Sequence, residues 1–245
     1  MSIWGKIIGG TAGFAMGGPI GAILGVMAGN LYDKSKKNKF NFNQISNQQK
    51  QNIFALSIII LSAKIAKSDG VVTKDEIQAF REKFKIPKEE LSQVSKIFNE
   101  AKKNTYGFKK IADQVGNLFS DNKLLLEELL NNLFYIAEAD GTVSVNEIDF
   151  LKSVAKSFNL SESDFQRIFH SRLKIKESDP FKVLGVDRED SNEIIRKKWI
   201  KLSKEHHPDF LIAKGMPQEF IDQSNKELSS INQAYDKIKK IREIS

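Results

Sequence analysis

The chain has 245 residues, of which 40% are hydrophobic and 28% are charged, so it contains enough apolar material for packed cores. This composition excludes a wholly disordered protein, and the absence of cysteine excludes disulfide scaffolds, cysteine zinc sites and thiol nucleophiles. The net charge is +7, and most of the excess lies in residues 1–50, which hold six lysines and one acid. Because a nucleic-acid binder usually carries its basic residues on a folded domain, we expect no nucleic-acid partner.

The first predicted element is an uncharged segment of 26 residues from Ile7 to Tyr32. As a helix it would be about 39 Å long, which is enough to cross a hydrocarbon core of about 30 Å. Residues 1–32 are therefore predicted to form a membrane anchor with a single transmembrane helix.

Glycine recurs at every fourth position here: Gly5, Gly9, Gly13, Gly17, Gly21, Gly25 and Gly29. Such a row leaves a strip without side chains along one side of a helix, where a second helix can approach closely. The pattern predicts a homodimer or higher oligomer through this glycine strip. A span that packs against nothing in particular is the alternative.

Lysines flank the span unequally. Only Lys6 precedes it, whereas Lys34, Lys36, Lys37 and Lys39 follow it. Because positive charge stays on the cytoplasmic side, we expect the bulk of the chain inside and the short N-terminus outside. A signal peptide cleaved near residues 26–28 is one alternative, and a scaffold with a buried glycine-rich hairpin is another. Residues 33–50 are predicted to form a polar linker whose lysines can lie against anionic lipid headgroups.

Residues 51–175 show helical periodicity with almost no strand signals. Two apolar stripes illustrate it: Ile53, Leu56, Ile60, Ala63 and Ala66 or Ile65, and Leu125, Leu129, Leu133, Ile136 and Ala137. Turn signals at Ile86-Pro87 and Tyr106-Gly107 divide the segment into several helices. An all-α domain is predicted.

Two stretches of this domain match at an offset of 71 residues, IAKSDGVVTKDEI from Ile65 and IAEADGTVSVNEI from Ile136. Each contains a capping box that begins a helix, Thr73 with Glu76 and Ser144 with Glu147. The alternative is a divalent-cation site built from Asp69, Asp140, Glu76 and Glu147, but the spacing does not fit an EF-hand loop. We therefore predict structural capping and no metal or other cofactor.

The last 67 residues carry three further signals in order. Asp179–Val186 opens the segment, and Ser191 is a plausible N-cap for a helix near Asn192–His206. His207-Pro208-Asp209 follows, and a longer helix through Leu228, Ile231, Ala234, Tyr235 and Ile238 ends the chain. Pro217 suits the first turn of that last helix.

These segments resemble known families. The paired helix and Asp-Gly-x-Val-[Ser/Thr]-x-x-Glu units resemble the TerB-like all-α domain, and residues 178–245 closely resemble a J-domain. With the glycine-rich span in front, the whole order resembles the membrane-anchored, DnaJ-like DjlA family of bacterial inner membranes. The resemblance implies a co-chaperone, not an enzyme, that docks on a DnaK-type chaperone and accelerates its ATP hydrolysis.

The same resemblance assigns residues. His207, Pro208 and Asp209 would form the loop needed for stimulation, and Arg196, Lys197, Lys201 and Lys204 would face an acidic surface of the chaperone. The sequence departs from the family where Trp199 replaces a usual tyrosine and where Ile200 and Phe210 replace basic residues. Leu211–Phe220 gives a longer link to the last helix than a minimal J-domain has. A membrane-bound stress or cation sensor with the J-domain as output remains the second hypothesis.

Overall fold

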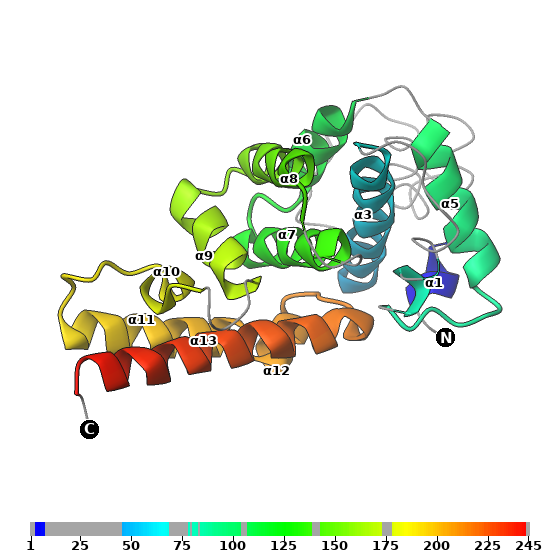
Figure 1. The fold of residues 1–245 in the computed structure, drawn as a ribbon. Helices are drawn as coiled ribbons and strands as arrows, with labels where there is room; N and C mark the ends of the chain where they lie inside the picture. Colours follow the sequence, from blue (N-terminus) through cyan, green and yellow to red (C-terminus); the bar gives the residue numbers. More distant parts are fainter. Residues whose placement is uncertain are drawn as a thin grey trace, which may run out of the picture.

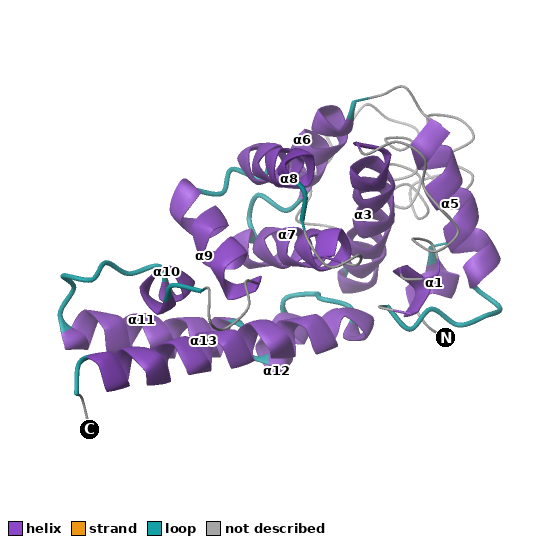
Figure 2. Cartoon of the chain, viewed as in Figure 1, coloured by secondary structure: helices purple, strands orange, loops and turns teal. Residues whose placement is uncertain are grey.

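All regular secondary structure in the described part of the chain is helical, as predicted (Figures 1 and 2). The structure is a computed structural model that describes residues 3–7, 46–68, 78, 80–82, 84–103, 107–138, 143–172 and 178–243. The predicted span beyond Ile7 lies outside these residues, and so do residues 69–77, which make up most of the first copy of the Asp-Gly repeat. None of the described helices is long and apolar enough to cross a membrane.

A long apolar helix, α3 (Asn47–Ser68), is central to the first unit. It is packed against α5 (Leu91–Lys103), α6 (Phe108–Leu118), α7 (Lys123–Ala137) and α8 (Val145–Ser157), and α9 (Glu162–Arg172) follows on the far side of α7. Its predicted stripe is confirmed, because Ile53, Leu56, Ile60 and Ala63 are fully buried. A helix that is apolar on nearly all sides belongs inside a core, and α3 has that position.

The helix α6 crosses α8 at close range. A Cβ added at Gly116 would lie only 2.3 Å from the carbonyl oxygen of Ser157. Only glycine allows the two backbones to approach this closely.

The C-terminal unit is a helical hairpin with a short helix across it. The hairpin consists of α11 (Asn192–Glu205) and α13 (Ile221–Ile241), which run side by side, and α10 (Pro180–Leu184) packs on both (Figure 1). Between them lie α12 (Pro208–Ala213) and a 3-10 turn at Gln218–Phe220. The apolar core of this unit is made by Phe181, Val183, Leu184, Ile195, Leu202, Ile231, Ala234 and Ile238.

The boundaries differ from the predictions in three places. The helix α3 begins at Asn47, so the end of the stretch expected as a linker is helical. The stretch Leu211–Phe220, expected as a link, begins inside the helix α12. Pro217 precedes the 3-10 turn, and α13 starts only at Ile221.

The first described residues form α1 (Ile3–Lys6), which lies against the helical core. The indole ring of Trp4 is completely buried and packs on Phe80, Phe84 and Phe220, with ring centroids 5.5–6.3 Å apart. The backbone N–H of Ile3 donates to Glu219 Oε1 at 2.7 Å. The described N-terminus therefore contacts both helical units.

Candidate functional site

The His-Pro-Asp sequence forms a sharp corner between α11 and α12. His207 is the N-cap of α12, and its Nδ1 accepts a hydrogen bond from the backbone N–H of Asp209 at 3.3 Å. Pro208 occupies the first helical position, where its missing N–H removes no hydrogen bond. The side chains of His207 and Asp209 are 55% and 90% exposed. The corner is thus fixed in its backbone and open to solvent in its side chains.

The predicted basic residues of α11 are all exposed: Arg196, Lys197, Lys201 and Lys204. Lys197 and Lys201 each have an acidic neighbour one turn away, Glu193 at 2.7 Å and Glu205 at 3.9 Å. Such exposed pairs contribute little to stability and leave the lysines available to a partner. The exposed side of α11 therefore presents a positive surface that ends at the His-Pro-Asp corner.

Lys198 differs from these four residues. It is half-buried, and burial lowers the pKa of its ammonium group, with the charges of Arg167 and Lys201 lowering it further. The long stem of this lysine thus packs on the protein, whereas its four basic neighbours point into solvent.

Trp199 on α11, one of the departures from the family pattern, contacts α13, the other helix of the hairpin. Its ring stacks on Tyr235 with centroids 4.3 Å apart and planes 4° from parallel. Its indole N–H donates to Asn232 Oδ1 at 2.9 Å, and the hydroxyl of Ser203 donates to the same oxygen at 3.3 Å. This tryptophan joins α11 to α13. The replacement of the family's usual tyrosine by tryptophan therefore changes the packing of the hairpin more directly than it changes the charged surface.

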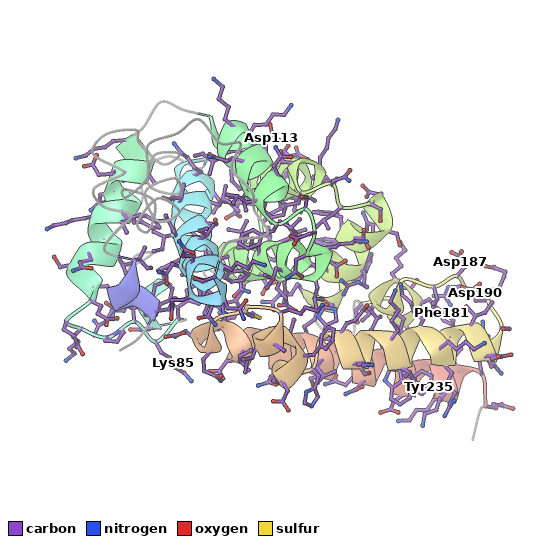
Figure 3. All side chains as sticks on the ribbon, turned by 180° about the vertical axis from the view of Figure 1, so that it is seen from behind. Lys85, Asp113, Phe181, Asp187, Asp190 and Tyr235 are labelled. Carbon is purple, nitrogen blue, oxygen red and sulfur yellow. The ribbon has the colours of Figure 1, made fainter. Side chains whose placement is uncertain are left out.

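At the end of the hairpin away from the His-Pro-Asp corner, two arginines pack around Phe181. The guanidinium carbons of Arg188 and Arg242 lie 4.8 and 5.5 Å from the ring centroid. Arg242 also donates to the backbone oxygen of Asp190 at 2.6 Å and to that of Arg188. Figure 3 shows Phe181 and Tyr235 at this end of the molecule, with Asp187 and Asp190 in the connecting loop. These contacts fix α10, the helix that the opening segment Asp179–Val186 forms.

Sequence reasoning missed a set of buried polar residues between the two units. We name them the interdomain polar cluster: Glu127, Glu128, Arg167, Ser171, His206, Ser224 and Glu227. Two adjacent acids inside the leucine-rich stretch Leu124–Leu130 were the signal that could have revealed it, because charged residues are rarely buried without partners. His206, the neighbour of the His-Pro-Asp corner, belongs to this cluster.

Within the cluster, Glu128 is completely buried and His206 is 2% exposed. Burial alone would raise the pKa of the Glu128 carboxyl, but the hydrogen bond and charge of His206, with hydrogen bonds from Ser224 and Asn131, lower it overall. Glu128 therefore stays ionised in the interior because its partners from α13 and from the end of α11 stabilise the anion.

The repeat in the central unit is only partly described. The second capping box is confirmed: Glu147 N–H donates to Ser144 Oγ at 3.3 Å, and Ser144 N–H donates to Glu147 Oε2 at 2.8 Å. Asp69, Glu76 and Asp140, the other carboxylates of the alternative cation site, lie outside the described residues. Glu147 is thus engaged in capping the start of α8, whatever the other three do.

Most of the predicted glycine strip cannot be compared with the structure. Gly5 lies in α1, and the other six glycines of the strip lie outside the described residues.

A helical hairpin that presents an exposed His-Pro-Asp corner defines a J-domain protein, and a family model for the DnaJ domain matches residues 179–243. Two more models match in the predicted order, the transmembrane domain of the co-chaperone DjlA at residues 1–41 and the tellurite resistance protein TerB at residues 55–170. The chain is thus a J-domain protein with the three-part domain order of the DjlA co-chaperones.

Curated relatives agree with the family models. The chain is 27% identical to the co-chaperone protein DjlA of Photobacterium profundum, over 97% of this chain and 98% of the relative. It is 26% identical to DjlA of Escherichia coli K12 over 98% of both chains, and 25% identical to that of Legionella pneumophila over 96% and 94%. No solved structure matches the chain. The predicted resemblance to the DjlA family is confirmed over nearly the whole length.

Proposed function

We propose that this chain is a membrane-anchored co-chaperone that recruits a DnaK-type chaperone and stimulates its ATP hydrolysis. The observation that supports this function best is the exposed His-Pro-Asp corner at the end of a positive helix face. In this account the chain hydrolyses nothing itself and needs no cofactor.

Two groups of residues have different tasks. Arg196, Lys197, Lys201 and Lys204 attract an acidic surface of the chaperone and raise the rate of encounter. His207, Pro208 and Asp209 then make the contacts that depend on orientation, because their backbone is fixed between two helices. The positive face should therefore govern the salt dependence of binding, and the corner should govern stimulation.

The membrane anchor comprises residues 1–32, with a linker at 33–50, a TerB-like unit at 51–175 and the J-domain at 178–245. The single span places the short N-terminus in the periplasm and the helical units in the cytoplasm of a bacterial inner membrane. This topology requires Ile3–Ile7 to leave the core position that they occupy in the structure. The buried indole N–H of Trp4 has no hydrogen-bond partner among the described residues, so this donor is unsatisfied in the core position. Because the chain has no cysteine, a Ser2→Cys variant tests the topology: labelling from the periplasm supports it, and protection contradicts it.

The TerB-like unit selects a client or partner in this account, and the glycine strip joins two copies of the chain in the membrane. Both tasks fit a co-chaperone that must hold a client near a membrane while the chaperone is recruited.

Chaperone capture tests the function. The full chain in detergent micelles is immobilised and exposed to a purified DnaK-type chaperone with ATP. We expect salt-sensitive capture that weakens when the four basic residues of α11 are replaced by alanine and that is lost in His207→Gln. Capture that ignores all of these changes would contradict the assignment of the site.

A further inference from the structure

The J-domain is docked on the central unit, and the contact lies directly beside the His-Pro-Asp corner. His206 immediately precedes that corner, and its Nδ1 lies 2.8 Å from Oε1 of Glu128 on α7. The hydroxyl of Ser224 on α13 donates to the other oxygen of the same carboxylate at 3.0 Å. One buried carboxylate of the central unit thus holds two helices of the J-domain.

The segment that follows the corner is also attached to α7. The side-chain amide of Asn122, the N-cap of α7, donates to the backbone oxygen of Lys214 at 3.1 Å. Lys214 directly follows α12, the short helix that begins with Pro208. The segment that carries the corner is therefore fixed to α7 on both sides.

A second buried contact extends this interface. Arg167 on α9 lies 2.5 Å from Glu127 Oε2 of the central unit and 2.9 Å from Glu227 Oε1 of α13. The hydroxyl of Ser171 donates to the other oxygen of Glu227 at 2.6 Å. The charges are buried but paired across the two units, which is the condition under which such groups are tolerated in an interior.

Apolar contacts also join the J-domain to the central unit. Four side chains of the J-domain are buried in the core of the central unit and not in the J-domain's own core: Leu211, Met216, Phe220 and Ile221. Leu211 lies in α12, Met216 in the loop that follows it, Phe220 in the 3-10 turn and Ile221 at the start of α13, so all four belong to the long connection after the corner. Detaching the J-domain would expose them, so docking is favoured by apolar burial as well as by the polar cluster.

We propose that Glu128 is a positioning residue for the His-Pro-Asp corner: by holding His206 it fixes the corner on the central unit, and the central unit thereby takes part in stimulating the chaperone. This inference rests on the proposed function, and it adds a task for the TerB-like unit. Its hydrogen bonds to the J-domain go to His206 and Ser224 and not to the corner itself, so it acts through His206.

The experiment compares docking and stimulation in the same full-length protein, kept in detergent micelles. Docking is measured as the distance distribution between spin labels at Lys152→Cys on α8 and Lys240→Cys on α13, since both positions are exposed and the chain has no cysteine. Stimulation is the single-turnover rate of ATP hydrolysis by a DnaK-type chaperone. We expect Glu128→Gln to broaden the distance distribution and to lower the maximal stimulation by about tenfold, within the range reported for coupling residues.

The matched control is Glu138→Gln. Glu138 also pairs with an arginine of α9, Arg172 at 2.7 and 3.0 Å, but both belong to the central unit. This variant should keep the narrow distance distribution and the wild-type stimulation. The variant His206→Asn should reproduce the defect of Glu128→Gln, and the double variant should be no worse than either, because both changes remove one contact.

A rescue separates positioning from general weakening of the fold. The tip of Lys226 on α13 lies 3.3 Å from the hydroxyl of Tyr135 on α7, so cysteines at these two positions can be joined by a short bismaleimide. Cross-linking should restore stimulation to Glu128→Gln, because it restores the docked arrangement.

Two kinds of result would overturn the positioning task of Glu128 and leave the proposed function standing. The first is normal stimulation by the Glu128→Gln variant, whether its J-domain is docked or undocked. The second is a loss of stimulation in this variant that cross-linking does not restore. A wild-type protein that binds the chaperone and fails to stimulate it would overturn the proposed function itself.

Discussion

Nη1 of Arg167 lies 2.9 Å from Oε1 of Glu227, and the two side chains are 3% and 1% exposed. The two residues belong to different units of the chain, one to the TerB-like unit and one to the J-domain. Glu127 and Glu227 outweigh the burial of the Arg167 guanidinium and raise its pKa, so the arginine stays charged in the interior.

Removing one partner of this contact should destabilise the protein strongly. Glu227→Ala leaves the positive charge of Arg167 with Glu127 alone, and breaking such buried pairs costs about 3–5 kcal/mol. Urea unfolding followed by circular dichroism measures the free energy of unfolding. The control is Glu100→Ala, which removes an exposed pair with Lys103 at 3.5 Å and should have no measurable effect. Equal stability of the two variants would contradict the buried contact.

Changes at Trp199 should affect the stability of the hairpin more than the stimulation of the chaperone. Trp199→Ala removes the stack on Tyr235 and the hydrogen bond to Asn232, so we expect a loss of about 2 kcal/mol in the free energy of unfolding. Trp199→Tyr restores the family's usual residue and keeps an aromatic stack, so stimulation of the chaperone should stay within about twofold of wild type. A large gain in stimulation by Trp199→Tyr would show instead that the departure weakens the chaperone contact.

Glu128 should make the fold sensitive to acid. Its partners hold the pKa of the folded-state carboxyl below its ordinary value of 4.5. A carboxylate with a depressed pKa stabilises the fold above the pKa of the unfolded chain, and this stabilisation is lost as the pH falls through the folded-state pKa. We therefore expect the free energy of unfolding of the wild type to fall more steeply below about pH 5 than that of Glu128→Gln. Parallel curves in urea titrations at pH 7, 5 and 4 would contradict this role.

Much of the helical order was readable from the sequence, because local signals specify it. Ser191 caps α11 and accepts from the backbone N–H of Ile194 at 3.3 Å, and Ser144 begins α8 as predicted. The helix α12 was missed although its signals were present, since a proline at the first position and a polar N-cap mark a helix start.

The docked position of the J-domain could not be predicted in this way. Glu128 meets His206 and Ser224 across 78 and 96 residues of sequence, and no periodic pattern encodes such pairs. The positive face of α11 and the His-Pro-Asp corner were predicted as residues, but the reason for their fixed placement lies in a different unit of the chain.

The glycine strip should govern self-association. Replacing Gly13, Gly17 and Gly21 by leucine fills the strip with side chains, so association in a membrane reporter should be abolished. Ala15→Leu with Ala22→Leu changes residues away from the strip if the segment forms the predicted helix, and serves as the control. Association that survives the glycine changes would exclude the strip as the interface.

The most direct test of the account is single-turnover ATP hydrolysis by a DnaK-type chaperone from the same organism. The full chain is added in detergent micelles, with His207→Gln as its matched variant, because that change leaves the buried cluster around His206 intact. We expect a clear acceleration by the wild type that the variant loses. A folded wild type that binds the chaperone without accelerating hydrolysis, or a variant that accelerates it equally, would contradict the account.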